Sequence, residues 1–177
     1  MINSTSPKNY AKALAEIAKD NVMSYEDIKH NLDTVILILQ SSSELQMTLE
    51  NTAISNSAKI DIINEVFKNQ INDKIINFLK ILVNKSKFNE LPLIIDEFNK
   101  ILDNVNNIKR VEVVSAVQLT EDQKNKITEK LENKLNKNII AEWIEQPEII
   151  GGLIIKIEDD VIDSSLKKKL ENLEITL

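Results

Sequence analysis

The sequence predicts a mostly α-helical protein, in which a helical bundle is followed by a small α/β domain. Apolar residues recur with the period of a helix over roughly the first 105 residues, and short alternating β-branched segments follow. Aromatic residues make up 4% of the 177 residues, with only two glycines and three prolines, too few for the frequent turns of a sandwich or barrel. Hydrophobic residues make up 42%, which is enough for a packed core.

The first helices are predicted from apolar stripes on one helical face and from the residues that bound them. Ser24 suits a helix cap, with Asp27 at the third position of a capping box. The serine run 41–43 ends that helix and precedes a short one. The stripes are Tyr10, Ala13, Leu14, Ile17 and Ala18 in the first helix, Ile28, Leu32, Val35, Ile36 and Leu39 in the second, and Leu45 and Leu49 in the short one.

Further stripes continue the helical pattern to residue 105, and they begin at Ser57. Pro92 suits the first turn of the last helix, where a missing N–H costs nothing. The stripes are Ile60, Ile63 and Phe67, then Ile71, Ile75, Phe78, Leu79 and Leu82, then Ile94, Phe98, Ile101, Leu102 and Val105. Five or six short helices within about 105 residues indicate a bundle.

The second domain is predicted from a change of period near Asn106, in the polar stretch 104–107. This places the domains at 1–105 and 106–177. Thr120 and Gln123 form a capping box for a helix lined by Ile127, Leu131 and Leu135. Strands are predicted at 109–113, 139–145 and 153–157, a bend at Gly151–Gly152, a turn at Asp159–Asp160, and a last helix striped by Leu166, Leu170 and Leu173.

Composition excludes several function classes. The net charge of −6 argues against nucleic acid as the main partner, because a phosphate-binding surface needs a basic excess. There is no cysteine, so disulfides and thiolate metal sites are excluded. The longest apolar stretch, 34–39, is far shorter than the ~20 residues that cross a bilayer, so we expect no direct membrane insertion.

An enzymatic alternative rests on the spacing of Asp159, Asp160 and Asp163, which can hold Mg²⁺ beside a diphosphate when it lies in a long helix. Here the segment follows a strand-like run, no second acidic motif occurs, and Arg110 is the only arginine. We therefore favour a turn at the first two aspartates and a helix cap at Asp163 or Ser164.

Other candidates for chemistry are weak. His30 has no second histidine near it in the sequence and is expected on the surface, and no glycine-rich phosphate loop occurs. Trp143 is expected to pack in the core rather than against a partner. We expect no catalytic residue, no bound metal and no cofactor.

Four segments together resemble one known family. They are Tyr10–Leu14, Asn77–Leu82, Ser115-Ala116 with Leu119-Thr120, and the tail from Pro147 through Gly151–Gly152 to Asp163–Leu166. In this order they are similar to the delta subunit of the rotary ATP synthase, called oligomycin sensitivity-conferring protein in mitochondria. The resemblance covers essentially the whole chain; Lys87 and Gln146 depart from the family's usual residues.

The resemblance implies an amino-terminal six-helix bundle and a small, more mobile α/β domain. It implies that the bundle holds amino-terminal segments of alpha subunits on the catalytic head, while the second domain binds the b subunits of the peripheral stalk. The protein would then be a non-catalytic stator link that couples rotation to ATP synthesis. It would be a peripheral membrane protein on the cytoplasmic side of a bacterial inner membrane, held there by the complex.

The partner interface is expected where the first helix and the 71–82 helix border a groove. The candidate residues are Tyr10, Ala13, Leu14, Ile17, Ile75, Phe78, Leu79 and Leu82. A helix docks in such a groove through apolar anchors at helical spacing. The alternative, that the candidates of the first helix are all bundle core, stays open. A generic helical adaptor is a further alternative, but it gives no reason for the tail motif.

Overall fold

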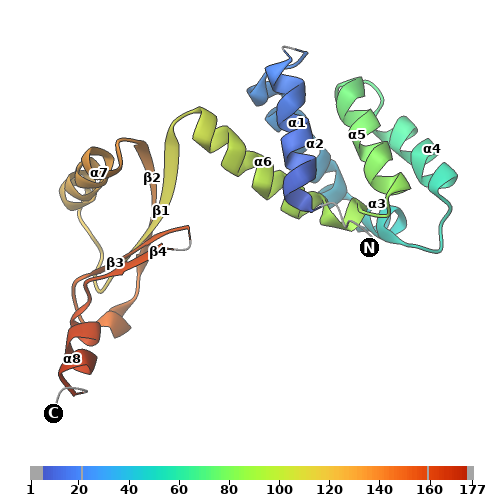
Figure 1. The fold of residues 1–177 in the computed structure, drawn as a ribbon. Coiled ribbons are helices and arrows are strands. Elements are labelled where there is room, and N and C mark those ends of the chain that lie inside the picture. The colour runs from blue at the N-terminus through green and yellow to red at the C-terminus, as the bar shows by residue number, and fades with distance from the viewer. Residues whose placement is uncertain (1–5, 21, 159, 175–177) are drawn as a thin grey trace. The chain divides into compact units, whose positions relative to one another are not determined.

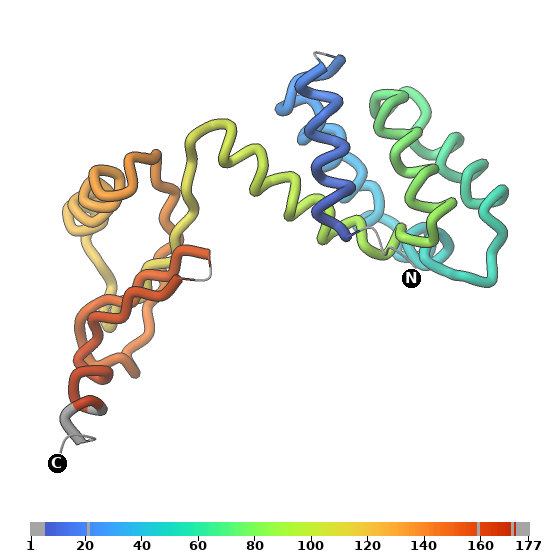
Figure 2. The backbone as a smooth tube through the Cα atoms, in the orientation of Figure 1, coloured from blue at the N-terminus to red at the C-terminus, as the bar shows by residue number. Residues whose placement is uncertain are grey.

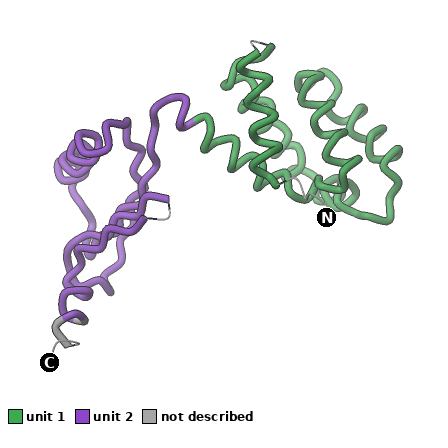
Figure 3. Tube along the Cα trace, viewed as in Figure 1, with its two compact units in different colours: residues 1–102 green, residues 103–177 purple. Residues whose placement is uncertain are grey.

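A computed structural model describes residues 6–20, 22–158 and 160–174. The chain divides into two compact units, residues 1–102 and 103–177, shown in two colours in Figure 3. Each unit is described by itself. Within the described ranges, no helix has both the length and the apolar character needed to cross a membrane.

In the described part of unit 1 every regular element is a helix, and Figure 1 labels the α-helices. The helices are α1 (Pro7–Lys19), α2 (Tyr25–Ser41), α3 (Ser43–Glu50), α4 (Asn56–Phe67), α5 (Asp73–Asn84), the single 3-10 turn η1 (Phe88–Glu90) and α6 (Leu91–Val105). The last turn of α6 is counted with unit 2. Figure 2 follows the backbone from one helix to the next through short connections.

Side-chain caps begin four of these helices. The hydroxyl of Ser24 accepts a hydrogen bond from the Asp27 amide at 3.0 Å, as its spacing predicts. Ser42 and Ser55 cap α3 and α4 in the same way, each at 3.3 Å. The Asn72 side chain accepts the Lys74 amide at 2.9 Å and begins α5. Each cap satisfies an amide that has no partner inside its helix, so the local sequence fixes where the helix begins.

Most residues of the predicted stripes form the core of unit 1, but Ala13 and Val105 are exposed and do not belong to it. Two aromatic rings, Tyr25 and Phe98, stack in it with centroids 6.3 Å apart. The fully enclosed side chains include Leu14, Ile28, Leu32, Ile63, Phe67, Ile75, Leu79, Leu82, Ile94 and Phe98. Each buried aliphatic or aromatic side chain of this size contributes about 1.5–3 kcal/mol to folding.

Unit 2 is a four-stranded sheet with helices. Its elements are β1 (Ile108–Ser115), α7 (Glu121–Leu135), β2 (Asn138–Glu145), the 3-10 turn η2 (Pro147–Ile149), β3 (Leu153–Ile157), β4 (Asp160–Asp163) and α8 (Leu166–Glu174). The strand order is β2-β1-β3-β4, as Figure 1 shows. β1 and β2 are parallel and are joined through α7, whereas β3 runs antiparallel to both β1 and β4.

One face of this sheet forms the second core. Val111 and Val113 of β1 are buried with Leu131 of α7, and Ile139 and Ile157 complete the cluster. The predicted capping box is present, since Thr120 and Gln123 cap each other at the start of α7. Trp143, paired with Val113 in the register, packs half-buried against this cluster, with the Lys124 ammonium 6.0 Å from its ring centroid. The ring therefore packs against the core, as expected, but part of its surface stays exposed.

The expected turn after β3 and the expected cap of α8 need correction. Asp160 begins β4 and pairs with Ile157, so it belongs to a strand; Asp159 lies outside the described residues. The cap of α8 is Ser165, whose hydroxyl accepts the Lys168 amide at 3.1 Å. Asp163 is held in the sheet, and the Ser164 hydroxyl donates to the Leu153 carbonyl at 2.7 Å, so neither is free to cap the helix.

Candidate partner-binding surfaces

The predicted interface residues of unit 1 separate into two groups. Five lie in the core: Leu14, Ile75, Leu79 and Leu82 are fully enclosed, and Phe78 is 7% exposed. Ala13 is exposed, while Tyr10 and Ile17 are half-buried at the edge of the same core. The five buried side chains pack beneath the surface. Ala13, Tyr10, Ile17 and the edge of the Phe78 ring are available for contact with a partner.

An aromatic contact joins the two helices at this place. The rings of Tyr10 in α1 and Phe78 in α5 meet edge to face, with centroids 6.4 Å apart. Ile81 lies one helical turn after Phe78 and therefore on the same side of α5. Its side chain is 50% exposed. We call Tyr10, Ala13, Ile17, Phe78 and Ile81 the α1–α5 surface.

Ile81 was missed by the sequence analysis because it lies outside the stripe of α5. The signal was nevertheless present: it is a large apolar residue on a face that otherwise carries Lys74, Asn77 and Asn84, all of them exposed. An exposed isoleucine beside a buried aromatic ring gives a helix from a partner a place for an apolar anchor.

Unit 2 exposes apolar residues near its carboxyl end. The side chains of Ile150, Leu166 and Leu170 are 61%, 46% and 53% exposed. The Leu166 amide donates to the Gly151 carbonyl at 2.9 Å, so the start of α8 lies against the end of η2. We call these three residues the η2–α8 surface.

The two glycines of the tail motif make this close approach possible. Gly152 has φ +82°, and a Cβ atom there would lie 2.4 Å from the Ser164 carbonyl oxygen. A Cβ atom on Gly151 would meet the Leu166 side chain at 2.8 Å. The backbone contact cannot give way, so position 152 requires glycine. The resemblance motif thus has a structural role, which is to hold η2 beside α8.

The backbone is strained next to these glycines. Ile150 has φ 68° and ψ −40°, a conformation that β-branched residues rarely adopt. Such a residue costs of the order of 1–3 kcal/mol, and strain of this kind clusters at functional positions. Ile150 therefore combines a strained backbone with an exposed apolar side chain.

The two described aspartates of the alternative site point away from each other; Asp159 lies outside the described residues. Asp160 and Asp163 are three positions apart in β4, so their side chains lie on opposite faces of the sheet. The hydroxyl and amide of Ser165 lower the pKa of Asp163, whose carboxylate is already engaged with that amide at 2.9 Å. Among the residues that the structure describes, no group of three or more acidic, histidine or cysteine side chains could hold a metal ion. His30 lies exposed on α2.

Comparison with known proteins identifies one family. The family model described as ATP synthase delta (OSCP) subunit matches residues 7–177. A protein from Clostridium botulinum strain Loch Maree named ATP synthase subunit delta is 33% identical over 167 residues, which cover 94% of this chain and 93% of the relative. A protein of the same name from Clostridium acetobutylicum is 32% identical over the same length.

A solved structure shares the fold. A chain in the mitochondrial ATP synthase hexamer of Toxoplasma gondii matches 98% of this chain with a TM-score of 0.69, and 97% of that chain is covered. The sequence identity is 19%, so this likeness bears on the fold alone.

Proposed function

Because this chain belongs to the ATP synthase delta (OSCP) family, a family of non-catalytic subunits, we propose that it is the stator link between the catalytic head and the peripheral stalk. It is a subunit that serves ATP synthesis and ion transport without making or breaking a bond itself. The observation that carries the proposal is the family match over residues 7–177, which includes both units. A joint of this kind needs affinity and stiffness, and each unit has a packed core with an apolar surface beside it.

The first unit, as a six-helix bundle domain of residues 1–105, would bind amino-terminal segments of the alpha subunits. The α1–α5 surface suits this role, since Ala13 lets a partner helix approach closely while Ile81 and the edge of Phe78 supply apolar contact. The buried Leu14, with Ile75, Leu79 and Leu82, would hold these side chains in place from beneath.

The second unit, as an α/β domain of residues 106–177, would bind the b subunits at the η2–α8 surface. Leu166 and Leu170 are one turn apart and form an apolar stripe on α8. The exposed run Lys167–Lys169 borders that stripe and favours a partner helix with acidic flanks. The strained, exposed Ile150 adds an anchor beside it.

Holding the chain at both ends explains how two modest contacts can resist torque. A standard protein interface buries on the order of 1,600 Å² in total. When two such contacts are linked in one chain, each raises the effective concentration of the other, so the joint is stronger than either contact alone. We propose that the whole assembly places this subunit at the cytoplasmic face of a bacterial inner membrane.

The proposal is tested by giving each half of the chain a choice of partner. Fragments 1–105 and 106–177 are each titrated calorimetrically with an alpha-subunit amino-terminal peptide and with the soluble part of subunit b. We expect the first fragment to bind only the peptide and the second only subunit b. Binding of both partners by one fragment, or of neither partner by two folded fragments, would contradict the proposal.

A further inference from the structure

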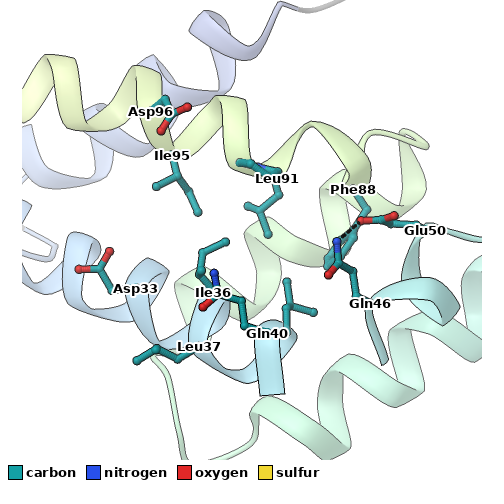
Figure 4. A pocket seen from close by; sticks show the side chains of 12 residues that line it. Asp33, Ile36, Leu37, Gln40, Gln46, Glu50, Phe88, Leu91, Ile95 and Asp96 are labelled. Atoms are coloured by element: carbon teal, nitrogen blue, oxygen red, sulfur yellow. Dashed lines mark hydrogen bonds between the residues drawn. The ribbon is translucent and has the colours of Figure 1, made fainter. Parts of the chain in front are cut away.

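A second apolar groove lies in unit 1, apart from the α1–α5 surface. It has a volume of about 550 Å³ and runs between α2 and α6, with α3 and η1 also contributing to its wall (Figure 4). Seven of its twelve lining residues are apolar: Ile36, Leu37, Leu39, Phe88, Leu91, Pro92 and Ile95. Leu37 is 66% exposed, although the other leucines of α2 are buried. The groove shares no residue with the α1–α5 surface.

Every charged side chain that lines this groove is acidic. Figure 4 shows Asp33 and Asp96 on facing helices at one end and Glu50 at the other. None of the described residues that line the groove is a lysine or an arginine. Lys29, outside the lining, pairs with Asp33 at 2.6 Å, and Gln46 donates a hydrogen bond to Glu50 at 2.9 Å. An apolar floor is therefore bounded at both ends by carboxylates.

We infer that this groove binds a short amphipathic helix of a partner protein that carries a basic residue near each end. The apolar face of such a helix covers Leu37 and the floor of the groove, as in other helix-in-groove complexes. Its basic ends meet Asp33 and Asp96 on one side and Glu50 on the other, which fixes its position along the groove. An acidic helix of the same shape places like charges together and is rejected.

The experiment compares two peptides on the full chain. Both are labelled helices of about 12 residues, or ~18 Å, with the same leucine stripe. One carries lysines at both ends and the other carries glutamates. Fluorescence anisotropy at low salt should show the lysine peptide binding at least about tenfold more tightly, with a preference that shrinks as salt is added. Equal affinity of the two peptides, or no binding of either, would overturn the inference.

Variants show whether the peptide occupies this groove. Leu37→Asp should weaken the lysine peptide at least about tenfold, and Asp96→Lys should reduce or reverse the preference for lysine over glutamate. Both side chains are exposed, so circular dichroism should show unchanged helicity. Ile81→Asp, on the α1–α5 surface, serves as the matched control and should leave this binding unchanged. If Ile81→Asp abolishes binding and the two groove variants do not, the peptide binds elsewhere and the inference is wrong.

Discussion

The ring of Tyr10 meets the ring of Phe78 nearly at a right angle, with centroids 6.4 Å apart and planes inclined by 74°. An edge-to-face pair of this kind contributes about 0.5–1.5 kcal/mol beyond the area it buries. The pair holds α1 against α5 in the free protein. The surface to which a partner helix would bind is therefore formed before the partner arrives. Binding then costs little rearrangement.

Ile81→Asp should weaken binding of the alpha-subunit segment. The substitution places a charge where an apolar anchor would be buried, and we expect a loss of about 1.5–3 kcal/mol, or at least tenfold in Kd. Because Ile81 is 50% exposed, the thermal stability of the protein should change little. Leu93→Asp, a change of a 56% exposed leucine on α6, is the matched control and should bind normally. An unchanged Kd for Ile81→Asp would remove this surface from the interface.

Leu14→Asp should unfold unit 1 rather than weaken a contact. The Leu14 side chain is fully enclosed, and loss of a buried leucine alone costs ~2–5 kcal/mol before the cost of burying a charge is added. The measurement is helicity by circular dichroism, compared with Ala13→Asp on the exposed side of the same helix. Full helicity in Leu14→Asp together with weakened head binding would show that this leucine faces the partner.

Ile150→Gly should separate stability from binding in unit 2. Glycine relieves the strain at φ 68°, which offsets its greater freedom in the unfolded chain, so the free energy of unfolding should stay level or rise by up to about 1 kcal/mol. Affinity for subunit b should fall at least about fivefold, because an exposed apolar anchor is lost. A variant that is as stable and binds subunit b as well as the parent protein would contradict this role.

Gly152→Ala should destabilise unit 2 far more than Gly151→Ala does. The methyl group at 152 meets a backbone oxygen at 2.4 Å, whereas at 151 it meets the movable end of the Leu166 side chain. We expect a loss of roughly 3 kcal/mol or more at 152. Denaturant titration followed by Trp143 fluorescence reports on unit 2 alone, since this is the only tryptophan of the chain. Equal losses in the two variants would show that the close approach to Ser164 is not the cause.

Structural features that depend on residues close together in the chain were predicted correctly from the sequence. Ser24 and Thr120 begin their helices where the spacing of their partners predicts, because a cap is satisfied within three residues. The stripe of α5 points into the core for the same reason: a helical period follows from the order of the residues alone. The mostly helical fold with a small sheet is confirmed.

The features that the sequence did not predict depend on contacts between residues far apart in the chain. β4 has only four residues, and it forms because Ile162 pairs with Ile155 of β3. The pattern of apolar residues within β4 does not predict this pairing. Ser165 caps α8, because Asp163 pairs with β3 and the Ser164 hydroxyl donates a hydrogen bond to the Leu153 carbonyl of β3. Spacing alone also could not show which candidate interface residues lie in the core and which at the surface, because that depends on how α1 and α5 pack among the other helices. Ile81, by contrast, is exposed as its place outside the stripe of α5 implies.

The central claim is that this subunit transmits mechanical load between two partners. The most direct measurement is ATP synthesis driven by a proton gradient in vesicles that have been stripped of the subunit and then supplied with it, intact or cut near Asn106. We expect the intact chain to restore synthesis and an equimolar mixture of the two halves to fail, even though each half still binds its partner. Full synthesis with the separated halves, or with no subunit added, would contradict the claim.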